Sequence, residues 1–415
     1  MTAAPQAPDF DGAHLRHVLT SAAAALGLEG FTNRLGVPES SICVVILADG
    51  LGEANLAAHT GHARHLGRAW RSSASAAALD TGTPTTTAAS LGSLGTGLTP
   101  AEHGLVGYDL YAEHLQRVVN MLGRWDPQVD PQKWQPHPSV LTRAEQAGAR
   151  MVTISRPGFR DSPLTAAALS GGEFFGANRI EIRFALCAEV ISEHRSRGGA
   201  LRRGPAPPLL VYLYVDELDK TGHSSGAGSD KWISMLESLD SAAGRLASSL
   251  HHQYGDQAAV LLTADHGMVN ISPEHRIDLS GREDLLTGVR HTGGEPRMLH
   301  LYSESGCESE VAEAFRSAFG EAVWAVTGDQ AIDAGWFGPA AAARSARVRP
   351  RIGDVIVAAA ADIALFHTDR TGTGPLQMVG QHGSLTEAER RVPLLELTGR
   401  GLEGSETREG TGTRA

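Results

Sequence analysis

The sequence predicts an α/β fold in which a central, mostly parallel β-sheet is covered by helices on both faces and carries a small inserted elaboration. Short apolar runs alternate along the 415 residues with longer segments of helical composition. This alternation is typical of a parallel sheet whose strands are joined by helices. Asp49 and Asp265 come directly or nearly directly after two of the apolar runs. The carboxyl ends of parallel strands are where open α/β sheets place their sites.

Five apolar runs have the length and composition of buried strands. They span Ile42–Leu47, Met151–Ile154, Leu209–Tyr214, Ala258–Leu262 and Leu394–Leu397. Helices are predicted at Val140–Ala147, Ala177–Glu193, Trp232–His252 and Glu308–Phe319. Ala88–Leu94 also has a helix-compatible composition, so Thr87 is expected near a helix N-terminus, where free N–H groups favour an anion.

One domain is expected over residues 1–397, and residues 268–380 are expected to form an elaboration near the site, because they separate two of the motifs described below. Within it, Asp354–Phe366 is interpreted as a strand plus an Ala-rich turn and is too short to span a bilayer. Gly107–Leu122 is expected to form a hairpin near the site. Residues Thr398–Ala415 are polar and Gly-rich, which predicts a disordered tail.

Four stretches far apart in the chain end in side chains that bind metals well. They supply Asp49 in VVILADGLG, Asp219 and His223 in LYVDELDKTGH, Asp265 and His266 in VLLTADHGM, and His382 in VGQHGSLT. A fifth stretch, Pro84–Leu98, supplies hydroxyl groups. Asp219 and His223 are four residues apart, so on a helical turn they share a face and can grip one ion. Three Asp, three His and one Thr are what two adjacent zinc ions and a phosphoryl-accepting nucleophile need.

Each of these residues also has a plainer interpretation. An Asp after a strand is more often a turn residue or a helix cap, and a Thr-rich run before a helix often caps it, as is expected of Thr85 and Thr86. The conjunction of all five stretches in this order favours the metal site. Arg290, His291 and Arg297 in VRHTGGEPR are candidates for contact with a leaving group, although surface polarity is the favoured interpretation.

At these motifs the chain resembles the alkaline phosphatase superfamily, and within it the nucleotide pyrophosphatase/phosphodiesterase branch. The segment Thr96–Gly107 is similar to the family's Thr-Gly-x-x-Pro-x-x-His-Gly motif, and the Asp-His-Gly and late His-Gly motifs match as well. Counting back from Thr96 puts the nucleophile at Thr87. The resemblance spans about residues 40 to 397 and implies an alkaline-phosphatase-like catalytic domain. It assigns two zinc ions to two ligand sets: Asp219, His223 and His382, and Asp49, Thr87, Asp265 and His266.

The resemblance implies a metal-dependent hydrolase that cleaves phosphodiester or nucleotide pyrophosphate bonds through a phospho-threonine intermediate, with Mn2+ as the alternative to Zn2+. Tyr108 stands where the family has an Asn that holds a phosphate oxygen, so Tyr108 is a candidate substrate-binding residue. Ala88 replaces an aromatic residue of many nucleotide-cleaving relatives. No Arg lies within Thr83–Leu98, and the absence of a bidentate clamp favours diesters over monoesters. A phosphonoacetate hydrolase, a phosphomonoesterase and a non-catalytic metal-binding descendant are the alternatives.

Composition limits the partners. Net charge is −11 with no basic run, which argues against a nucleic-acid polymer and leaves a small phosphate ester, nucleotides included, as the expected substrate. Three scattered cysteines are too few for a disulfide framework, and Cys43 is expected in the core. The first 17 residues lack a basic start followed by an apolar core, so no secretory signal and no membrane association are predicted and a cytoplasmic enzyme is expected. The oligomeric state is left open.

Overall fold

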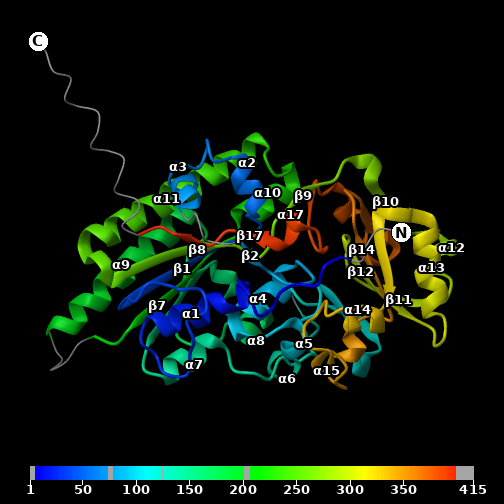
Figure 1. The fold of residues 1–415 in the computed structure, drawn as a ribbon, viewed down its shortest axis with the longest axis horizontal. Coiled ribbons are helices and arrows are strands. Elements are labelled where there is room, and N and C mark those ends of the chain that lie inside the picture. Colours follow the sequence, from blue (N-terminus) through cyan, green and yellow to red (C-terminus); the bar gives the residue numbers. More distant parts are fainter. Residues whose placement is uncertain (1–4, 73–77, 124, 201–205, 399–415) are drawn as a thin grey trace, which may run out of the picture.

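The computed structural model describes residues 5–72, 78–123, 125–200 and 206–398. Its centre is a six-stranded sheet with the strand order β18, β8, β1, β7, β5, β6 (Figure 1). The strands are β1 (Ile42–Ala48), β5 (Arg150–Ser155), β6 (Glu173–Gly176), β7 (Leu209–Val215), β8 (Ala258–Thr263) and β18 (Leu395–Glu396). All pair in parallel except β18, which runs antiparallel to β8. The predicted mostly parallel sheet is therefore confirmed.

All five predicted strands occur, and the inner strands β1, β7 and β8 are apolar runs that the fold buries on both faces, whereas β18 is a partly buried edge strand. In β1 every residue is buried, and Ile42 lies between Leu209 of β7 and Ala258 of β8. Strand β6 was not predicted. It lies at the sheet edge, and only its two central residues, Phe174 and Phe175, are apolar and half-buried, so it lacks the apolar run of an inner strand.

Helices cover both faces of this sheet (Figure 1). One face carries α2 (Glu53–Ala58), α3 (Arg64–Ser72), α9 (Ile180–Ala200), α10 (Glu217–Ser225) and α11 (Asp230–Tyr254). The other face carries α1 (Val18–Ala25), α4 (Thr87–Thr96), α7 (Val140–Gln146) and α8 (Pro163–Ala168), with the short helices α5 (Pro100–His103) and α6 (Pro131–Trp134) nearby. The predicted helices correspond to α7, α9, α11 and α13 (Glu308–Phe319).

Helix α4 is buried along its whole length. Two of its glycines allow this close packing, since a Cβ on Gly95 would lie 2.0 Å from the carbonyl oxygen of Ala168 in α8. A Cβ on Gly92 would lie 2.6 Å from the His103 ring. The helix ends at Gly97, whose φ of 75° is the left-handed conformation that favours glycine at this position.

The inserted part of the chain forms a second, antiparallel sheet beside the first (Figure 1). Its strands lie in the order β11 (Val289–Glu295), β12 (Met298–Ser303), β14 (Val355–Ala359) and β13 (Val323–Thr327). Helix α13 packs on it and shares a core with it that includes Leu301, Phe315 and Val357. This sheet lies within the predicted elaboration. The single strand expected at Asp354–Phe366 is in fact two, β14 and β15 (Ala364–Phe366), and β15 pairs with β10 (Arg276–Asp278).

Small two-stranded pairings complete the structure. The predicted hairpin is present as β3 (Asp109–Ala112) and β4 (Arg117–Asn120). The other two pairs are β2 (Leu79–Asp80) with β17 (Arg391–Val392), and β9 (Val269–Asn270) with β16 (Gly380–Gln381). The short helices α12 (Glu283–Leu286), α14 (Gly328–Asp333), α15 (Ala340–Ala343), α16 (Thr368–Thr371) and α17 (Glu387–Arg390) lie in the second half of the chain.

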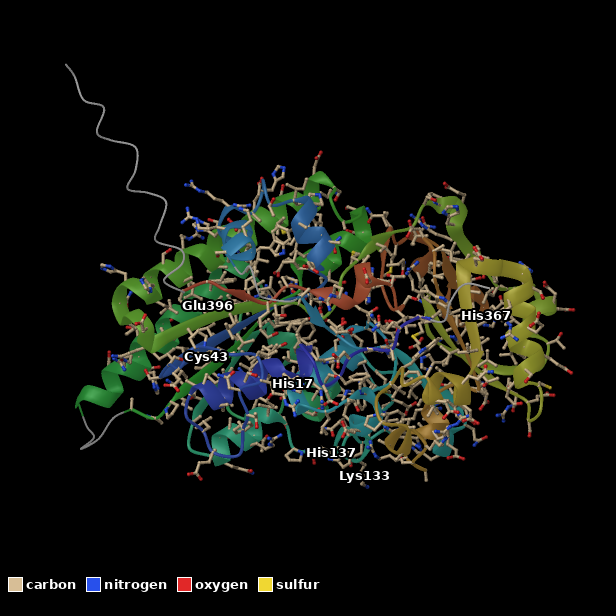
Figure 2. All side chains as sticks on the ribbon, viewed as in Figure 1. His17, Cys43, Lys133, His137, His367 and Glu396 are labelled. Atoms are coloured by element: carbon tan, nitrogen blue, oxygen red, sulfur yellow. The ribbon has the colours of Figure 1, made fainter. Side chains whose placement is uncertain are left out.

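Cys43 lies buried within the central sheet, as expected for a core residue (Figure 2). Among the described residues, no helix combines the length and the apolar character needed to cross a membrane. The predicted disordered tail lies outside the described residues except for Thr398. That residue is buried, and its hydroxyl accepts a hydrogen bond of 3.1 Å from the Val260 amide.

Candidate active site

The candidate metal ligands gather at one edge of the central sheet, where β8, β1 and β7 end. Asp49 follows β1, Asp265 and His266 follow β8, and β7 leads into α10, which carries Asp219 and His223. His382 follows β16, and Thr87 is the first residue of α4. The parallel register carries these distant segments to the same edge, because neighbouring parallel strands end together.

Four of these residues form one group, in which three lie around the His266 ring. His266 Nε2 lies 3.3 Å from Asp49 Oδ1, 3.7 Å from Asp265 Oδ2 and 3.3 Å from Thr87 Oγ1. The other three residues form a second group: His223 Nε2 lies 3.2 Å from Asp219 Oδ1 and 3.3 Å from His382 Nε2. The two groups adjoin, since the rings of His266 and His382 stack at 3.6 Å.

The three histidines share one hydrogen-bonding pattern. Nδ1 of His223 lies 2.8 Å from the Gly380 carbonyl, that of His382 lies 2.7 Å from the Thr85 carbonyl, and that of His266 lies 3.0 Å from the Gly267 carbonyl. A carbonyl oxygen only accepts, so Nδ1 carries the proton and donates in all three. In the neutral imidazole, Nε2 then has its lone pair directed into the cluster. Metal-binding histidines are typically held in this way.

Three buried carboxylate oxygens in the cluster, Asp49 Oδ1, Asp219 Oδ1 and Asp265 Oδ2, accept no hydrogen bond, and the nitrogens nearest to them are the histidine Nε2 atoms, which carry no proton in the neutral Nδ1–H form. Burial raises the pKa of Asp49 well above its ordinary value, and the charges of Asp265 and Asp219 add to this. Burial likewise raises the pKa of Asp265. Unpartnered buried carboxylates are costly, and a cation among them removes the cost.

The donor set fits divalent metal ions. Among the described residues, two groups place ligand atoms within 4.8 Å of one another: Asp49, Asp265 and His266, and Asp219, His266 and His382. Imidazole nitrogens with carboxylate oxygens are typical zinc ligands. The orphaned oxygens and the free Nε2 atoms point to the same conclusion, and two ions side by side match the two adjoining groups.

Thr87 lies where a nucleophile would be needed, with its hydroxyl 3.3 Å from His266 Nε2 at the N-terminus of α4. The capping expectation for its neighbours is wrong. Thr86 occupies the N-cap position without a side-chain capping bond. The Thr85 hydroxyl donates to the Ser384 carbonyl at 2.9 Å and accepts from the Gly383 amide at 3.0 Å. Thr85 therefore ties the segment of Thr87, the predicted nucleophile, to the loop that carries His382.

Two cavities open on either side of Thr87. The sheet-side cavity, of about 280 Å3, is mostly apolar and includes Phe159, Phe174 and Tyr214 in its lining. The insert-side cavity, of about 250 Å3, is lined by residues of the inserted part and by Tyr108. Thr87, Asp219 and Leu122 line both cavities. The candidate metal cluster therefore borders two cavities, and each has room for one substituent of a bound small molecule.

Tyr108 is half-buried in the wall of the insert-side cavity, and burial raises the pKa of its hydroxyl. The cationic side chains near the cluster are already neutralised. Arg370 in the insert-side cavity lies 2.6 Å from Asp109, and Lys220 in the sheet-side cavity pairs with Asp216 at 2.5 Å. Neither side chain is a free clamp for a doubly charged phosphate.

The interpretation of Arg297 as a leaving-group contact or a surface residue is wrong. Arg297 is buried and donates to both carboxylate oxygens of Glu389, at 2.8 and 2.7 Å, and to the carbonyls of Ala361 and Ile363. Arg290 and His291 do not line either cavity. The Arg290 guanidinium donates to the Ser303 carbonyl, and His291 stacks on Tyr111 at 5.1 Å.

Two residues near the cluster were missed by sequence reasoning. The Tyr214 hydroxyl donates to Asp49 Oδ2, and its only sequence signal is a polar aromatic at the end of a strand. Glu295 lies in the insert-side cavity and is buried, which raises its pKa to about 8. A Cβ on Gly383 would lie 2.5 Å from Glu295 Cγ, so this carboxylate packs beside the loop of His382. Its signal was the polar turn Gly293–Pro296 just before the apolar start of β12.

The sheet, its two helical layers and the Asp and His cluster at the carboxyl edge define a member of the alkaline phosphatase superfamily. Within that class, the family model of type I phosphodiesterase / nucleotide pyrophosphatase matches residues 43–385. The chain belongs to this family of hydrolases.

Individual relatives are more distant. A 64-residue stretch is 36% identical to mouse ectonucleotide pyrophosphatase/phosphodiesterase family member 7, and the rat protein matches equally. That match spans 15% of this chain and 15% of the mouse protein, well under two thirds of either.

Solved structures share the fold. Murine ectonucleotide pyrophosphatase / phosphodiesterase 5 superposes with a TM-score of 0.64 at 18% identity, covering 85% of this chain and 87% of that one. An inactive variant of the same murine protein in complex with AMP gives a TM-score of 0.63 at 17% identity, with the same coverage of both chains. Phosphonoacetate hydrolase from Sinorhizobium meliloti 1021, in complex with phosphonoformate, gives 0.61 at 20% identity over 87% of this chain and 91% of that one.

Proposed function

We propose that the chain is a di-zinc phosphodiesterase that cleaves small phosphate diesters or nucleotide pyrophosphate bonds through a phospho-threonine intermediate. One observation carries the proposal. Three Nε2 atoms and three unpartnered carboxylate oxygens converge beside the hydroxyl of Thr87, at the N-terminus of a buried helix. Metal coordination is what allows a threonine hydroxyl to act as a nucleophile near neutral pH.

The residues divide the work. Asp49, Asp265, His266 and Thr87 would hold one ion, and Asp219, His223 and His382 the other. When bound, the ions supply positive charge for the attacking and leaving oxygens. Thr87 Oγ1 attacks phosphorus as its proton passes to solvent water, and the leaving oxygen departs with the electrons of the broken P–O bond and takes up a proton from solvent. Water then hydrolyses the phospho-threonine. The backbone carbonyls at Gly380, Thr85 and Gly267 keep the three imidazoles oriented throughout.

The walls favour a diester. A diester carries two substituents, and the two cavities that meet at Thr87 provide a place for each. Arg370 and Lys220 are paired with Asp109 and Asp216, so the second negative charge of a monoester has no free guanidinium or ammonium group to meet. The AMP complex of the murine structural relative supports a nucleotide as one candidate substrate.

Metal analysis combined with a substrate panel tests the proposal. The unchelated protein should contain about two divalent ions per chain. It should hydrolyse bis-p-nitrophenyl phosphate and nucleotide p-nitrophenyl esters with a higher kcat/KM than p-nitrophenyl phosphate or phosphonoacetate. Fewer than about one ion per chain would contradict the paired site. A preference for the monoester or for phosphonoacetate would replace the diesterase with one of those activities.

A further inference from the structure

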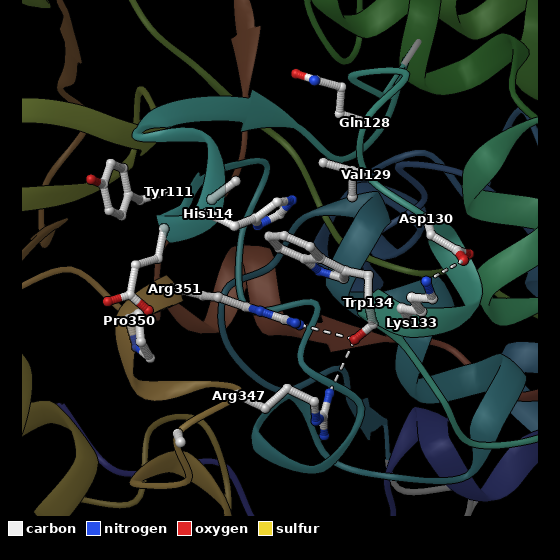
Figure 3. A pocket seen from close by; sticks show the side chains of 13 residues that line it. Tyr111, His114, Gln128, Val129, Asp130, Lys133, Trp134, Arg347, Pro350 and Arg351 are labelled. Carbon is white, nitrogen blue, oxygen red and sulfur yellow. Dashed lines mark hydrogen bonds and ion pairs between the residues drawn. The ribbon is translucent and has the colours of Figure 1, made fainter.

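A third cavity, of about 450 Å3, lies apart from the metal-ligand cluster and shares no lining residue with the two cavities at Thr87. Figure 3 shows it between the hairpin residues Tyr111–His114, the segment Gln128–Trp134 and the segment Ala346–Arg351. Its volume is within the range of small-molecule sites. Nothing in the proposed function uses it.

Two arginines without acidic partners form its inner wall. Arg347 and Arg351 each donate through Nη1 to the same oxygen, the Trp134 carbonyl, at 3.1 Å (Figure 3). Their other hydrogen bonds also go to backbone carbonyls, at Glu102, His103 and Gly104. Among the described residues, no carboxylate forms an ion pair with either guanidinium. Two like charges are therefore held together without a counter-charge, in a protein whose net charge is −11.

Arg351 is only 8% exposed, and its guanidinium lies 3.7 Å from the centre of the Trp134 ring. Burial and the neighbouring Arg347 lower its pKa to about 9. Nε and Nη2 of Arg351 make no hydrogen bond to any described residue, and neither atom is fully buried. These donors therefore remain available to a ligand.

Other side chains of the lining add to the positive charge. Trp134, which is 5% exposed, stacks with Arg351, while its own Nε1–H is sealed from the cavity. Lys133 and His114 also line the cavity, together with the two acids Glu113 and Asp130, and Asp130 Oδ2 lies 3.9 Å from Lys133 Nζ at the rim. The lining thus offers N–H donors with an excess of positive charge, which is what an oxyanion requires.

We propose that this cavity is a second binding site, separate from the metal-ligand cluster, for a small molecule that carries a phosphate or another oxyanion group. The hydrogen bonds by which Arg347 stabilises the fold are compatible with anion binding in this cavity. Its carbonyl contacts hold the end of α5, while the free donors of Arg351 face a cavity that is larger than the anion alone. A phosphorylated small molecule has the size and the charge that fit it.

Calorimetric titration of the metal-loaded, full-length protein with sulfate tests the site. Wild type should show two classes of sulfate site, one at the metals and one in this cavity. Arg351→Gln should weaken the cavity site at least tenfold, the effect of losing a charge-assisted hydrogen bond. Lys133→Glu, at an exposed side chain, should weaken it about fivefold by charge reversal at the rim. Both variants should keep wild-type diester hydrolysis.

His382→Ala is the matched control, because it should remove the sulfate site at the metals and spare the one in the cavity. AMP replaces sulfate in a second titration, and loss of a site in Arg351→Gln with either probe supports the proposal. Selenate soaked into crystals should give anomalous density beside Arg351. Sulfate and AMP isotherms of Arg351→Gln and Lys133→Glu that both match wild type, with selenate only at the metals, would overturn it.

Discussion

Replacing Arg297 with methionine should lower the free energy of unfolding by about 3–5 kcal/mol, the cost of leaving one partner of a buried ion pair alone. Both side chains of the Arg297–Glu389 pair are 0% exposed, and the arginine makes two bonds to the carboxylate and two to backbone carbonyls. Methionine nearly preserves the volume, so the loss reports the charge left on Glu389 and the unpaired carbonyls rather than a cavity.

The melting temperature translates this cost into a measurement. A chain of 415 residues has an unfolding entropy of about 0.9 kcal/mol per kelvin, so the midpoint of the metal-loaded protein should fall by roughly 3–6 °C in scanning calorimetry. Arg282→Met is the matched control. Arg282 pairs with Asp284 on the surface, and its removal should leave the midpoint unchanged.

Glu389 also supports the loops that carry two of the candidate metal ligands. Its Oε1 accepts from the Ser384 amide at 3.0 Å, and its carbonyl accepts from the Gly267 amide at 2.8 Å, next to the loops of His382 and His266. Arg297→Met should therefore weaken metal binding by about tenfold in competition with a chelator, the lower end of the usual effect of supporting residues.

The double variant Arg297→Met with Glu389→Gln tests whether the loss of stability comes from the buried charge on Glu389. The amide keeps an acceptor for Ser384 without a charge, so the double variant should lose at least about 2 kcal/mol less than the sum of the two single variants. Additive losses, or a single Arg297→Met variant as stable as wild type, would refute the account of a buried charge pair.

Three further predictions concern the site and its surroundings. Thr87→Ala should remove nearly all turnover while keeping the fold and the metals, and Thr86→Ala should be mild; the reverse outcome in steady-state assays would move the nucleophile by one residue. Tyr108→Phe should lower diester kcat/KM about tenfold, the scale of one modest hydrogen bond, and Tyr108→Asn should retain more activity; near-native rates for both would make Tyr108 a packing residue. Burial lowers the pKa of His103 to about 3, and its Nδ1 accepts from the Leu105 amide at 3.1 Å, so His103 is neutral when folded. Stability that depends on neutral His103 is present above pH ~6.5 and is lost as the pH falls toward 3, so between pH 6 and 4 the unfolding free energy of wild type should fall about 1 kcal/mol per pH unit more steeply than that of His103→Gln. An imidazole NMR resonance of His103 that titrates above pH 5 would contradict this.

The parts of the fold that depend on residues close together in the sequence could be predicted from the sequence. Strands β1, β7 and β8 are continuous apolar runs, and burial on both faces follows directly from that composition. Edge strand β6 has no such run and escaped prediction.

In the site, too, contacts between residues close in the sequence could be predicted and contacts between distant residues could not. Asp219 and His223 are four apart on one helix, so their proximity could be predicted from spacing. Arg297 and Glu389 are separated by 92 residues, and polarity alone gave no sign that each is buried against the other. The partners of the histidine Nδ1 atoms are backbone carbonyls, which carry no sequence signal at all.

The tight packing of α4 has a consequence for how this scaffold adapts. Because a Cβ on Gly95 would clash with the backbone of α8 and one on Gly92 with the His103 ring, the helix that carries Thr87 is packed closely against its neighbours. Changes in substrate specificity are therefore expected in the cavity walls. The inserted sheet, which has its own hydrophobic core, contributes to the wall of the insert-side cavity. Under the proposed function, loops exchanged between relatives at β11, β12 and α16 should alter which esters are accepted while Thr87 stays in place. The helix that carries Thr87 is the constant part of the site, and the cavity wall formed by the inserted sheet is the part that can vary.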